Sequence, residues 1–394
     1  MNHPYADRGI SWGAEDDQLS DNNLLNRLRD ENFDVAINEA TALCGYALTL
    51  KIGVKKLVSA MPISLTEKFI EPFAIDVNPS HIPGKKMLTT SNISVALSRS
   101  TDLMGFWERV YNVISLIIIS TFAETVTMPT TVQLLRKYFG PSIDSAYALD
   151  VAAQSTFLLA NGNEFIEFPR PINRKIVYVS DVGVGKPQPL NEEFRNLMDS
   201  AKGGVMLVSM GSIAASSRMP MSIKNAFVSS FRAFPNISFI WKYEEDDDLG
   251  CDSQNIIKKK WIPQSDLLAH ANMRAFLSHC GITSMAESLR AGVPMICIPL
   301  FFDQRQNAKK MEKHHATIVI EKDNITTTSI SWALRSVLSD KRLPTYFEFK
   351  YSVNKVEKRP PGWEKGALLG ERRPNANGNG DGKAKKRCGT HGTL

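Results

Sequence analysis

The stretch from Trp261 to Gln304 contains side chains whose types and spacing suit the binding of a diphosphate. His279-Cys280-Gly281 follows an apolar run typical of a buried strand, and Thr283–Arg290 has the pattern of a helix. The start of a helix offers unpaired N–H groups and the positive end of its dipole, which together favour an anion. We expect Gly281 to let the backbone approach the phosphates, and His279 and Ser284 to donate hydrogen bonds to them.

Other residues of the same stretch are placed to bind the groups on either side of a diphosphate. Glu287 lies one turn into the helix, where its carboxylate could accept hydrogen bonds from two hydroxyls of a ribose. Trp261 follows another predicted strand and could stack against a flat base. Asp303 and Gln304 start the next helix and could bind the hydroxyls of a sugar.

Taken one at a time, these residues also have purely structural interpretations. A tryptophan such as Trp261 is more often a core residue, and a glutamate such as Glu287 is more often a solvated helix residue. His279 would serve as well to cap the helix, and Asp303 is a good N-cap for its own helix. The prediction of a binding site therefore rests on the combination.

The second half of the chain predicts a parallel sheet covered by helices on both faces. Short apolar runs alternate with helical patterns, which is typical of a doubly wound domain that binds ligands at the carboxyl ends of its strands. The predicted strands are Val205–Ser209, Ile237–Trp241, Lys259–Ile262, Ala275–Ser278, Met295–Ile298 and Thr317–Glu321.

The first half has the same alternation in a less regular form. Helices are predicted over Leu24–Asp30 and Thr41–Ile52, and strands over Phe33–Asn38 and Lys56–Ala60, which favours a parallel sheet here too. The most apolar run, Val113–Ala123, is too short to span a bilayer, so we expect a buried strand or helix segment.

Composition divides the chain into four parts: a polar segment (1–22), a first domain (23–189), a second domain (190–343) and a basic tail (344–394). The prolines and glycines of Phe165–Ile172 and Gly183–Pro189 predict the linker between the two domains. The tail is rich in Lys, Arg, Gly and Asn, which predicts disorder.

Charge and cysteine content exclude some classes of function. Ten Lys/Arg and four Asp/Glu in residues 355–394 account for the whole net charge of +6, so the rest of the chain is neutral and predicts no nucleic-acid surface. The five cysteines lack metal-ligand spacing, and we expect thiols rather than a metal site. We expect no signal peptide and no transmembrane helix in this chain.

The order and spacing of ten residues resemble the donor box of the UDP-glycosyltransferase family, which includes plant enzymes and animal glucuronosyl- and glucosyltransferases. They match without an insertion, and the chain most resembles nematode members. The resemblance extends to Phe33–Glu39, Phe165–Val184 and Val205–Ser212, whose Gly211-Ser212 turn would face the phosphates. The ten residues are Trp261, Gln264, His279, Gly281, Ser284, Glu287, Pro294, Pro299, Asp303 and Gln304.

This resemblance implies a GT-B fold, in which two Rossmann-like domains face each other across a cleft. It implies that residues 23–189 form a partial acceptor-binding domain and that residues 190–343 form the UDP-sugar-binding domain. It implies an inverting transfer of a hexosyl group from UDP-glucuronic acid or UDP-glucose to a hydroxyl of a small lipophilic acceptor. No cofactor and no metal are expected, because the helix start and His279 would balance the diphosphate charge. The resemblance also implies the endoplasmic reticulum as location and leaves open a homo- or hetero-oligomer with related transferases.

The sequence departs from the family at the catalytic base. Family members use a His near the start of the first domain, held by an acidic partner about a hundred residues later. Glu39 occupies the partner's position, but only His3 precedes it, in a polar context unlike the end of a strand. We therefore expect a chain truncated at its N-terminus, with the first domain incomplete and no C-terminal membrane helix.

Three hypotheses follow from these observations. The first is a UDP-hexosyltransferase, and the second is a non-catalytic UDP-sugar-binding remnant that lacks the catalytic His. The third is a dehydrogenase-type Rossmann protein, which would need GxGxxG after its first strand, whereas Val205–Ser209 is followed by Met-Gly-Ser-Ile-Ala-Ala.

Overall fold

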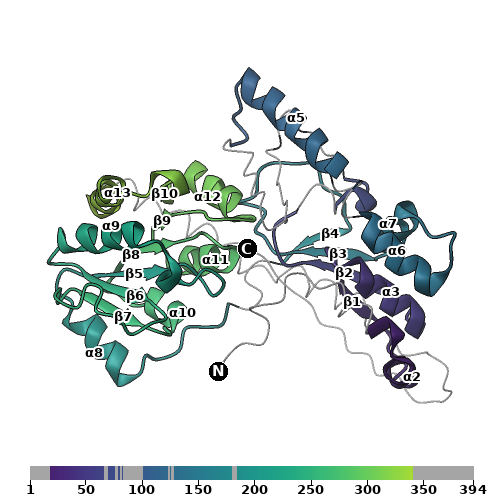
Figure 1. The fold of residues 1–394 in the computed structure, drawn as a ribbon, viewed down its shortest axis with the longest axis horizontal. Helices are drawn as coiled ribbons and strands as arrows, with labels where there is room; N and C mark the ends of the chain where they lie inside the picture. Colours follow the sequence, from purple (N-terminus) through teal and green to yellow (C-terminus); the bar gives the residue numbers. More distant parts are fainter. Residues whose placement is uncertain are drawn as a thin grey trace, which may run out of the picture.

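Two parallel sheets, one in each half of the chain, organise the computed structural model (Figure 1). The structure describes residues 18–65, 70–75, 79, 82, 101–122, 125, 128–179 and 184–339. The predicted α/β class is confirmed. The tail 344–394 and most of the segment 1–22 lie outside the described residues.

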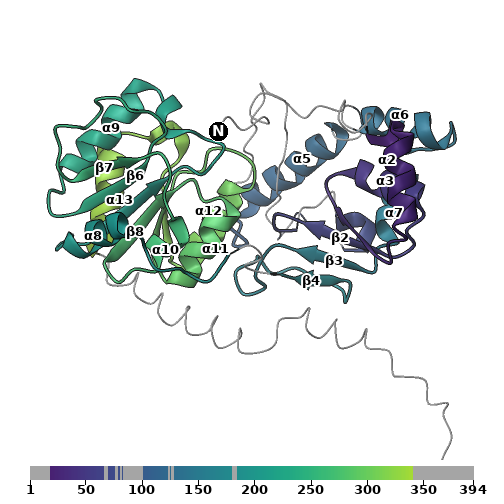
Figure 2. The same ribbon diagram turned by 90° about the horizontal axis from the view of Figure 1, so that it is seen from below.

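The first sheet has four parallel strands in the order β1-β2-β3-β4 (Figure 2). Its strands are β1 (Ala36–Glu39), β2 (Leu57–Met61), β3 (Phe157–Ala160) and β4 (Ile176–Tyr178). The accompanying helices are α2 (Asn22–Asp30), α3 (Leu43–Ile52), the 3-10 turn η1 (Glu71–Phe73), α5 (Phe106–Phe122), α6 (Met128–Phe139) and α7 (Ser145–Ala153).

Strand β1 forms one edge of this sheet among the described residues. Apolar side chains before and within it are exposed, with 69% of the surface of Ile37 and 48% of that of Val35 accessible. An exposed apolar edge is a surface that a further strand would cover.

Helix α5, at the top of Figure 1, contradicts the expectation of a buried apolar segment. Ile114, Ile117 and Ile118 are 50%, 59% and 55% exposed, whereas Asn112 and Ser115 on the opposite face are each 2% exposed. The inward face is polar because the Asn112 amide donates to two backbone carbonyls, at 2.7 and 2.8 Å. No helix in the described part of the chain is long and apolar enough to cross a membrane.

The second sheet has six parallel strands in the order β10-β9-β8-β5-β6-β7. They are β5 (Val205–Ser209), β6 (Ser238–Lys242), β7 (Ile256–Lys259), β8 (Met273–Ser278), β9 (Met295–Cys297) and β10 (Thr317–Val319). The helices are α8 (Glu192–Ser200), α9 (Met221–Arg232), α10 (Gln264–Leu268), α11 (Ile282–Ala291), α12 (Gln304–Lys313) and α13 (Thr327–Ser339), with 3-10 turns η3 (Ser216–Arg218) and η4 (Lys322–Asn324).

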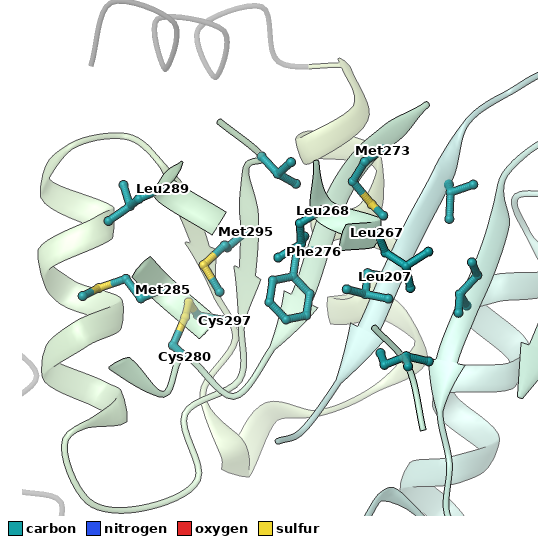
Figure 3. Close-up of a cluster of buried hydrophobic side chains, with 14 of the residues drawn as sticks. Leu207, Leu267, Leu268, Met273, Phe276, Cys280, Met285, Leu289, Met295 and Cys297 are labelled. Atoms are coloured by element: carbon teal, nitrogen blue, oxygen red, sulfur yellow. A yellow bond between two sulfur atoms is a disulfide. The ribbon is translucent and has the colours of Figure 1, made fainter. Parts of the chain in front are cut away.

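Separate apolar clusters fill the two faces of this sheet. Side chains of α8, α10, α11 and α12 pack on one face, and side chains of α9 and α13 pack on the other. Figure 3 shows the first cluster, in which Met295 and Cys297 lie between Met285 and Leu289 of α11 and Phe276 and Leu207 of the sheet. The doubly wound prediction for this half is thus confirmed in the arrangement of its layers.

Two predicted boundaries differ from the structure. The strand expected over Lys259–Ile262 is β7 and ends at Lys259, before the turn that contains Trp261. The linker expected to begin at Phe165 begins later, because β4 still pairs with the first sheet after that segment. Ile166 and Phe168 are buried in this segment. The prolines of the segment therefore interrupt secondary structure although the chain still packs against the molecule.

Candidate donor-binding site

The strand order of the second sheet brings two loops together where it reverses. β5 lies between β8 and β6, and Ser209 at the end of β5 is in register with Ser278 at the end of β8. Doubly wound sheets bind ligands at such switch points, outside the carboxyl ends of the strands. Gly211 follows β5 and His279 follows β8, so the two loops form neighbouring walls of one site.

The ring of His279 sits between two glycines. Gly211 has a φ of +85°, and a Cβ added to it would lie 2.7 Å from Cε1 and Nε2 of the ring. A Cβ on Gly281 would lie 2.6 Å from Nε2. Both positions therefore favour glycine because a side chain there would collide with the imidazole of His279, in addition to any need for an anion to approach the backbone closely.

Burial lowers the pKa of His279 to about 4, and the carboxylate of Asp303 offsets part of this effect. The ring is therefore neutral at pH 7 and offers one N–H donor. The family resemblance implies that His279 helps to balance the charge of a diphosphate, but a neutral ring carries no charge and could contribute only a hydrogen bond. The start of α11, with Gly281 as N-cap, supplies the positive end of a helix dipole beside it.

Cys280 is covalently tied to the neighbouring strand. It has a φ of +60°, is fully buried and forms a disulfide with Cys297 at the end of β9, with 5.4 Å between the Cα atoms (Figure 3). The expectation of thiols is wrong for this pair, because parallel pairing of β8 with β9 places the two side chains together. Cys44 is a buried thiol and Cys251 an exposed one.

Glu287 is held by two side chains of the short helix α10. Ser265 donates its hydroxyl to Oε1 at 2.7 Å, and the Gln264 amide donates to Oε2. The same amide contacts Ser284 Oγ at 3.3 Å. The solvated reading of Glu287 is wrong, because these contacts orient the carboxylate at the first turns of α11, and its remaining lone pairs could accept further hydrogen bonds.

Trp261 is 73% exposed, directly after the turn that follows β7. A core role for this side chain is therefore excluded. Its ring is available to stack against a flat ligand.

The loop before α12 is held by two buried amides. Gln304 Oε1 accepts hydrogen bonds from the backbone N–H groups of Leu300 and Phe301 at 2.8 and 3.1 Å. Asn307, fully buried, donates to Oδ2 of Asp303 at 2.7 Å and to the carbonyl of Cys280 at 3.2 Å. Asp303 does not cap α12 through its side chain. Asn307 therefore joins the loop of Cys280 to the loop of Asp303.

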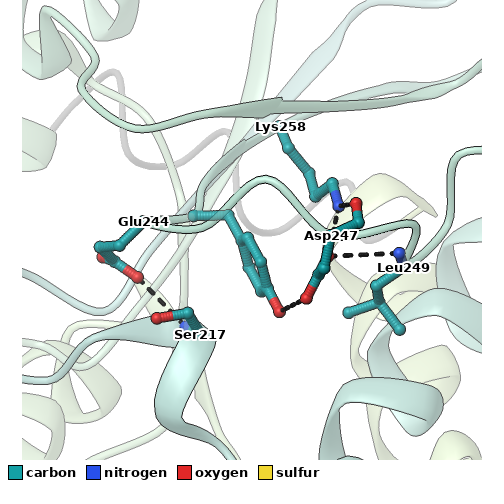
Figure 4. Close-up of polar contacts among 6 residues, drawn as sticks. Ser217, Glu244, Asp247, Leu249 and Lys258 are labelled. Carbon is teal, nitrogen blue, oxygen red and sulfur yellow. Dashed lines mark hydrogen bonds and ion pairs between the residues drawn. The ribbon is translucent and has the colours of Figure 1, made fainter.

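The loop after β6 is tied to the loop after β5 by polar contacts (Figure 4). Glu244 accepts a hydrogen bond from the backbone N–H of Ser217 at 3.1 Å. Asp247 accepts from Lys258 Nζ at 2.6 Å and from the Tyr243 hydroxyl at 2.5 Å. Burial raises the pKa of Asp247, but these hydrogen bonds outweigh it and lower that pKa to about 2. An ionised Asp247 thus holds the loop after β6 against Lys258 of β7.

A family model described as UDP-glucuronosyl and UDP-glucosyl transferase matches residues 13–350. This chain belongs to that family. UDP-glucosyltransferase 2 of Dactylopius coccus is 28% identical over 326 residues, which cover 82% of this chain and 60% of that relative. Human UDP-glucuronosyltransferase 1A4 is 28% identical over 81% of this chain and 56% of that relative. A relative from the nematode Caenorhabditis elegans is 30% identical over 78% of this chain and 56% of its own length.

The solved structures agree on the fold. A UDP-glucose:anthocyanidin 3-O-glucosyltransferase in complex with UDP aligns with a TM-score of 0.60 at 16% identity, over 91% of this chain and 79% of that one. The predicted GT-B class is confirmed, with two Rossmann-like domains. This member of the family spans about 60% of the length of the curated relatives it matches.

The remaining predicted site residues lie apart from the cluster around His279 or at its rim. Ser212 is exposed next to Gly211. Glu39 ends the edge strand β1 and accepts a hydrogen bond from the hydroxyl of Thr41. The histidines that the structure describes, His270, His279, His314 and His315, all lie in the second half of the chain.

Three structural residues of the second half were given no role from the sequence. Ser265 orients Glu287, Asn307 joins two loops, and Lys310 lies buried on α12. Asn307 and Lys310 fall on the inner face of a predicted helix, where polar residues signal a buried contact. Nothing in the sequence indicated a role for Ser265, because its hydrogen bond to Glu287 depends on the packing of α10 against α11.

Proposed function

We propose that the chain binds a UDP-hexose, UDP-glucuronic acid or UDP-glucose, and transfers the sugar to a hydroxyl of a small lipophilic acceptor. The observation that carries this proposal is the packing of the His279 ring between Gly211 and Gly281, beside the start of α11. In this reading the N–H groups of α11 and the neutral ring of His279 bind the diphosphate. Trp261 stacks on the uracil, Glu287 accepts the ribose hydroxyls, and Asp303 and Gln304 lie toward the sugar.

The proposed reaction is a single inverting displacement without a metal ion. A base removes the proton of the acceptor hydroxyl, the oxygen forms a bond to the anomeric carbon, and the bond from that carbon to the phosphate breaks. UDP leaves with the electron pair, and the helix dipole with the His279 N–H stabilises the charge that develops on it. Glu39 is the proposed partner of the base.

A second candidate is a UDP-sugar-binding protein without transferase activity. It is favoured by one observation: no described histidine lies in the first half, near Glu39. Location in the endoplasmic reticulum and pairing with related transferases belong to either candidate and rest on family membership alone.

We expect Glu287→Ala to weaken binding of UDP about tenfold or more, because Glu287 is the proposed ribose ligand. Asp303→Ala should leave UDP affinity within about twofold and reduce only the extra affinity for a UDP-sugar. Isothermal titration of the whole chain with UDP, UDP-glucose and UDP-glucuronic acid measures both effects. Equal losses of UDP affinity in the two variants would contradict the assignment.

Release of UDP separates the two candidate functions. The chain is incubated with each UDP-sugar and a phenolic acceptor, and free UDP is followed by chromatography. Acceptor-dependent UDP release supports the transferase, whereas tight UDP binding with no release supports the binding protein.

A further inference from the structure

A buried ion pair joins the helix of Asp303 to the first half of the molecule. Lys310 lies on α12 and is fully buried, and its ammonium donates to Glu167 Oε1 at 2.6 Å and to Ser64 Oγ at 2.7 Å. Glu167 and Ser64 both belong to the first half, Glu167 between β3 and β4 and Ser64 after β2. The side chain of Glu167 is only 4% exposed.

The position of Lys310 on α12 relates this pair to the proposed donor site. Asp303 and Gln304 are at the start of α12, and Lys310 follows two turns later in the same helix. The carboxylate of Asp303 is close enough to Lys310 to influence it electrostatically. Figures 1 and 2 both show α12 on the side of the second half that faces the first. A shift of one half against the other would therefore act on the helix that carries the proposed sugar ligands.

Burial makes the pair sensitive to the spacing of the two halves. An ammonium and a carboxylate removed from water are tolerated only with close mutual contact and satisfied hydrogen bonds. Separation of the two halves would break the contact between the ammonium and the carboxylate. Such a pair adds little stability compared with apolar residues of the same size, but it favours one arrangement over others.

Other contacts across the junction are less buried or hold only the connecting segment. Lys313 on α12 pairs with Asp102, but both side chains are partly exposed. Arg290 donates to the carbonyl of Val184, and Asp266 accepts from the N–H of Gln188, so both contacts fix the linker. Among the ion pairs of the described residues, the pair of Lys310 and Glu167 combines the deepest burial with a span between the halves.

The geometry points to Lys310 and Glu167 as positioning residues: they hold the two halves at one angle and so place the donor-sugar end of α12 against the acceptor half. The expected effect on the rate of sugar transfer rests on the proposed function. The expected effect on the arrangement of the two halves does not. Neither residue is assigned a contact with substrate.

The test compares Lys310→Met with Lys309→Met in the full chain. Lys309 is the adjacent residue on α12 and pairs only with Glu312 of the same helix among the contacts observed. Spin labels at Asp34 and Lys202, which are exposed in the first and second halves, report the distance between them once Cys251 and Cys388 are replaced by Ser. We expect one narrow distance for the parent and for Lys309→Met, and a broad distribution for Lys310→Met.

A double variant distinguishes positioning from a general effect on folding. Lys310→Met alone removes the ammonium that contacts the buried carboxylate of Glu167, so the melting temperature of this variant should fall. In Lys310→Met with Glu167→Gln we expect the melting temperature to recover while the distance distribution stays broad. If stability and the narrow distance recover together, or if Lys310→Met keeps the narrow distance, the inference is overturned.

The kinetic and binding readouts keep this inference separate from the proposed function. UDP affinity should stay within about twofold in all variants, while kcat for transfer should fall about 10- to 100-fold in both variants that lack Lys310, because small displacements of reacting groups cost rate. A parent chain that binds no UDP refutes the proposed function, yet the distance measurement still decides the role of the pair.

Discussion

At the scale of residues, His279 is defined by what surrounds it. Its ring fills the space that side chains at positions 211 and 281 would occupy, and Ser278 Oγ lies 3.3 Å from Nδ1. Close packing around the ring is what removes water from it and keeps it neutral. The candidate site thus contains a packed, neutral imidazole with one N–H group.

The glycine at position 211 can be tested against another left-handed glycine. Gly211→Ala and Gly53→Ala both place a Cβ at positive φ, and each should lose about 1 kcal/mol of stability. Only Gly211→Ala also forces the added carbon into the His279 ring, because nothing lies within 4 Å of a Cβ at Gly53. We expect a tenfold or greater loss of UDP affinity in Gly211→Ala alone, measured by titration calorimetry alongside urea denaturation. Unchanged UDP affinity in that variant would remove His279 from the binding site.

The depressed pKa of His279 predicts a pH-dependent stability. Between its ordinary value and about 4, the unfolded chain binds a proton at this residue and the folded protein does not, so the free energy of unfolding falls as the pH falls. The loss from pH 7 to pH 4 should approach about 3 kcal/mol for this group. Urea denaturation of the parent and of His279→Gln at several pH values isolates the effect, since the variant cannot titrate. Parallel curves for the two proteins would show that the residue is not buried as described.

At the scale of elements, α5 has its polar face inward and its apolar face outward. Asn112 on the inner face satisfies the carbonyls of Pro79 and Ile82, and Ile118 lies on the outer face. The sequence of an apolar run does not determine which face of the segment packs against the rest of the protein. The apolar run was compatible with a strand or a helix, and the orientation of α5 depends on hydrogen bonds to a segment about thirty residues earlier.

This orientation reverses the usual expectation for substitutions. Asn112→Leu should cost about 1–3 kcal/mol of stability, because it leaves two buried carbonyls without their donor. Ile118→Ser on the exposed face should change stability by no more than about 0.5 kcal/mol. Urea denaturation of both variants provides the comparison. A larger loss for Ile118→Ser would mean that this face is covered in solution.

The disulfide and Asn307 act together on the loops of the donor half. Cys280 is linked to Cys297 by its side chain and to Asn307 by its carbonyl. The loops after β8 and β9 are therefore joined twice, so the phosphate and sugar ends of the proposed site keep one spacing. A rigid spacing of this kind lowers the conformational entropy that these loops would otherwise lose when a two-part ligand binds.

At the scale of the whole molecule, the two halves have mostly separate cores. The two apolar clusters of the second sheet draw one buried side chain, Ile166, from the first half. The clusters of the first half contain none from the second. The described contacts that cross the junction include the polar ones of Lys310 and Lys313.

Separate cores predict that UDP stabilises one half preferentially. In scanning calorimetry we expect two unfolding transitions, and UDP at 100 times its dissociation constant should stabilise the one that belongs to the second half by about 2.7 kcal/mol. Glu287→Ala, with UDP binding about tenfold weaker, should reduce that stabilisation to about 1.4 kcal/mol at the same UDP concentration. A single transition, or equal shifts of both, would show that the halves unfold as one unit.

The sequence by itself determined the family, the α/β class and most strands of the second half. Their apolar runs are continuous and buried on both faces, and the box from Trp261 to Gln304 has fixed local spacing. Local periodicity is sufficient for such features because it reflects contacts between near neighbours in the chain.

Only the tertiary structure decided the features that depend on residues far apart in the chain. Pairing of β8 with β9 joins Cys280 to Cys297, the strand order places Gly211 against His279, and closure of the two halves buries Lys310 against Glu167. Each of these contacts depends on which elements become neighbours in space, and local patterns of side chains do not determine this.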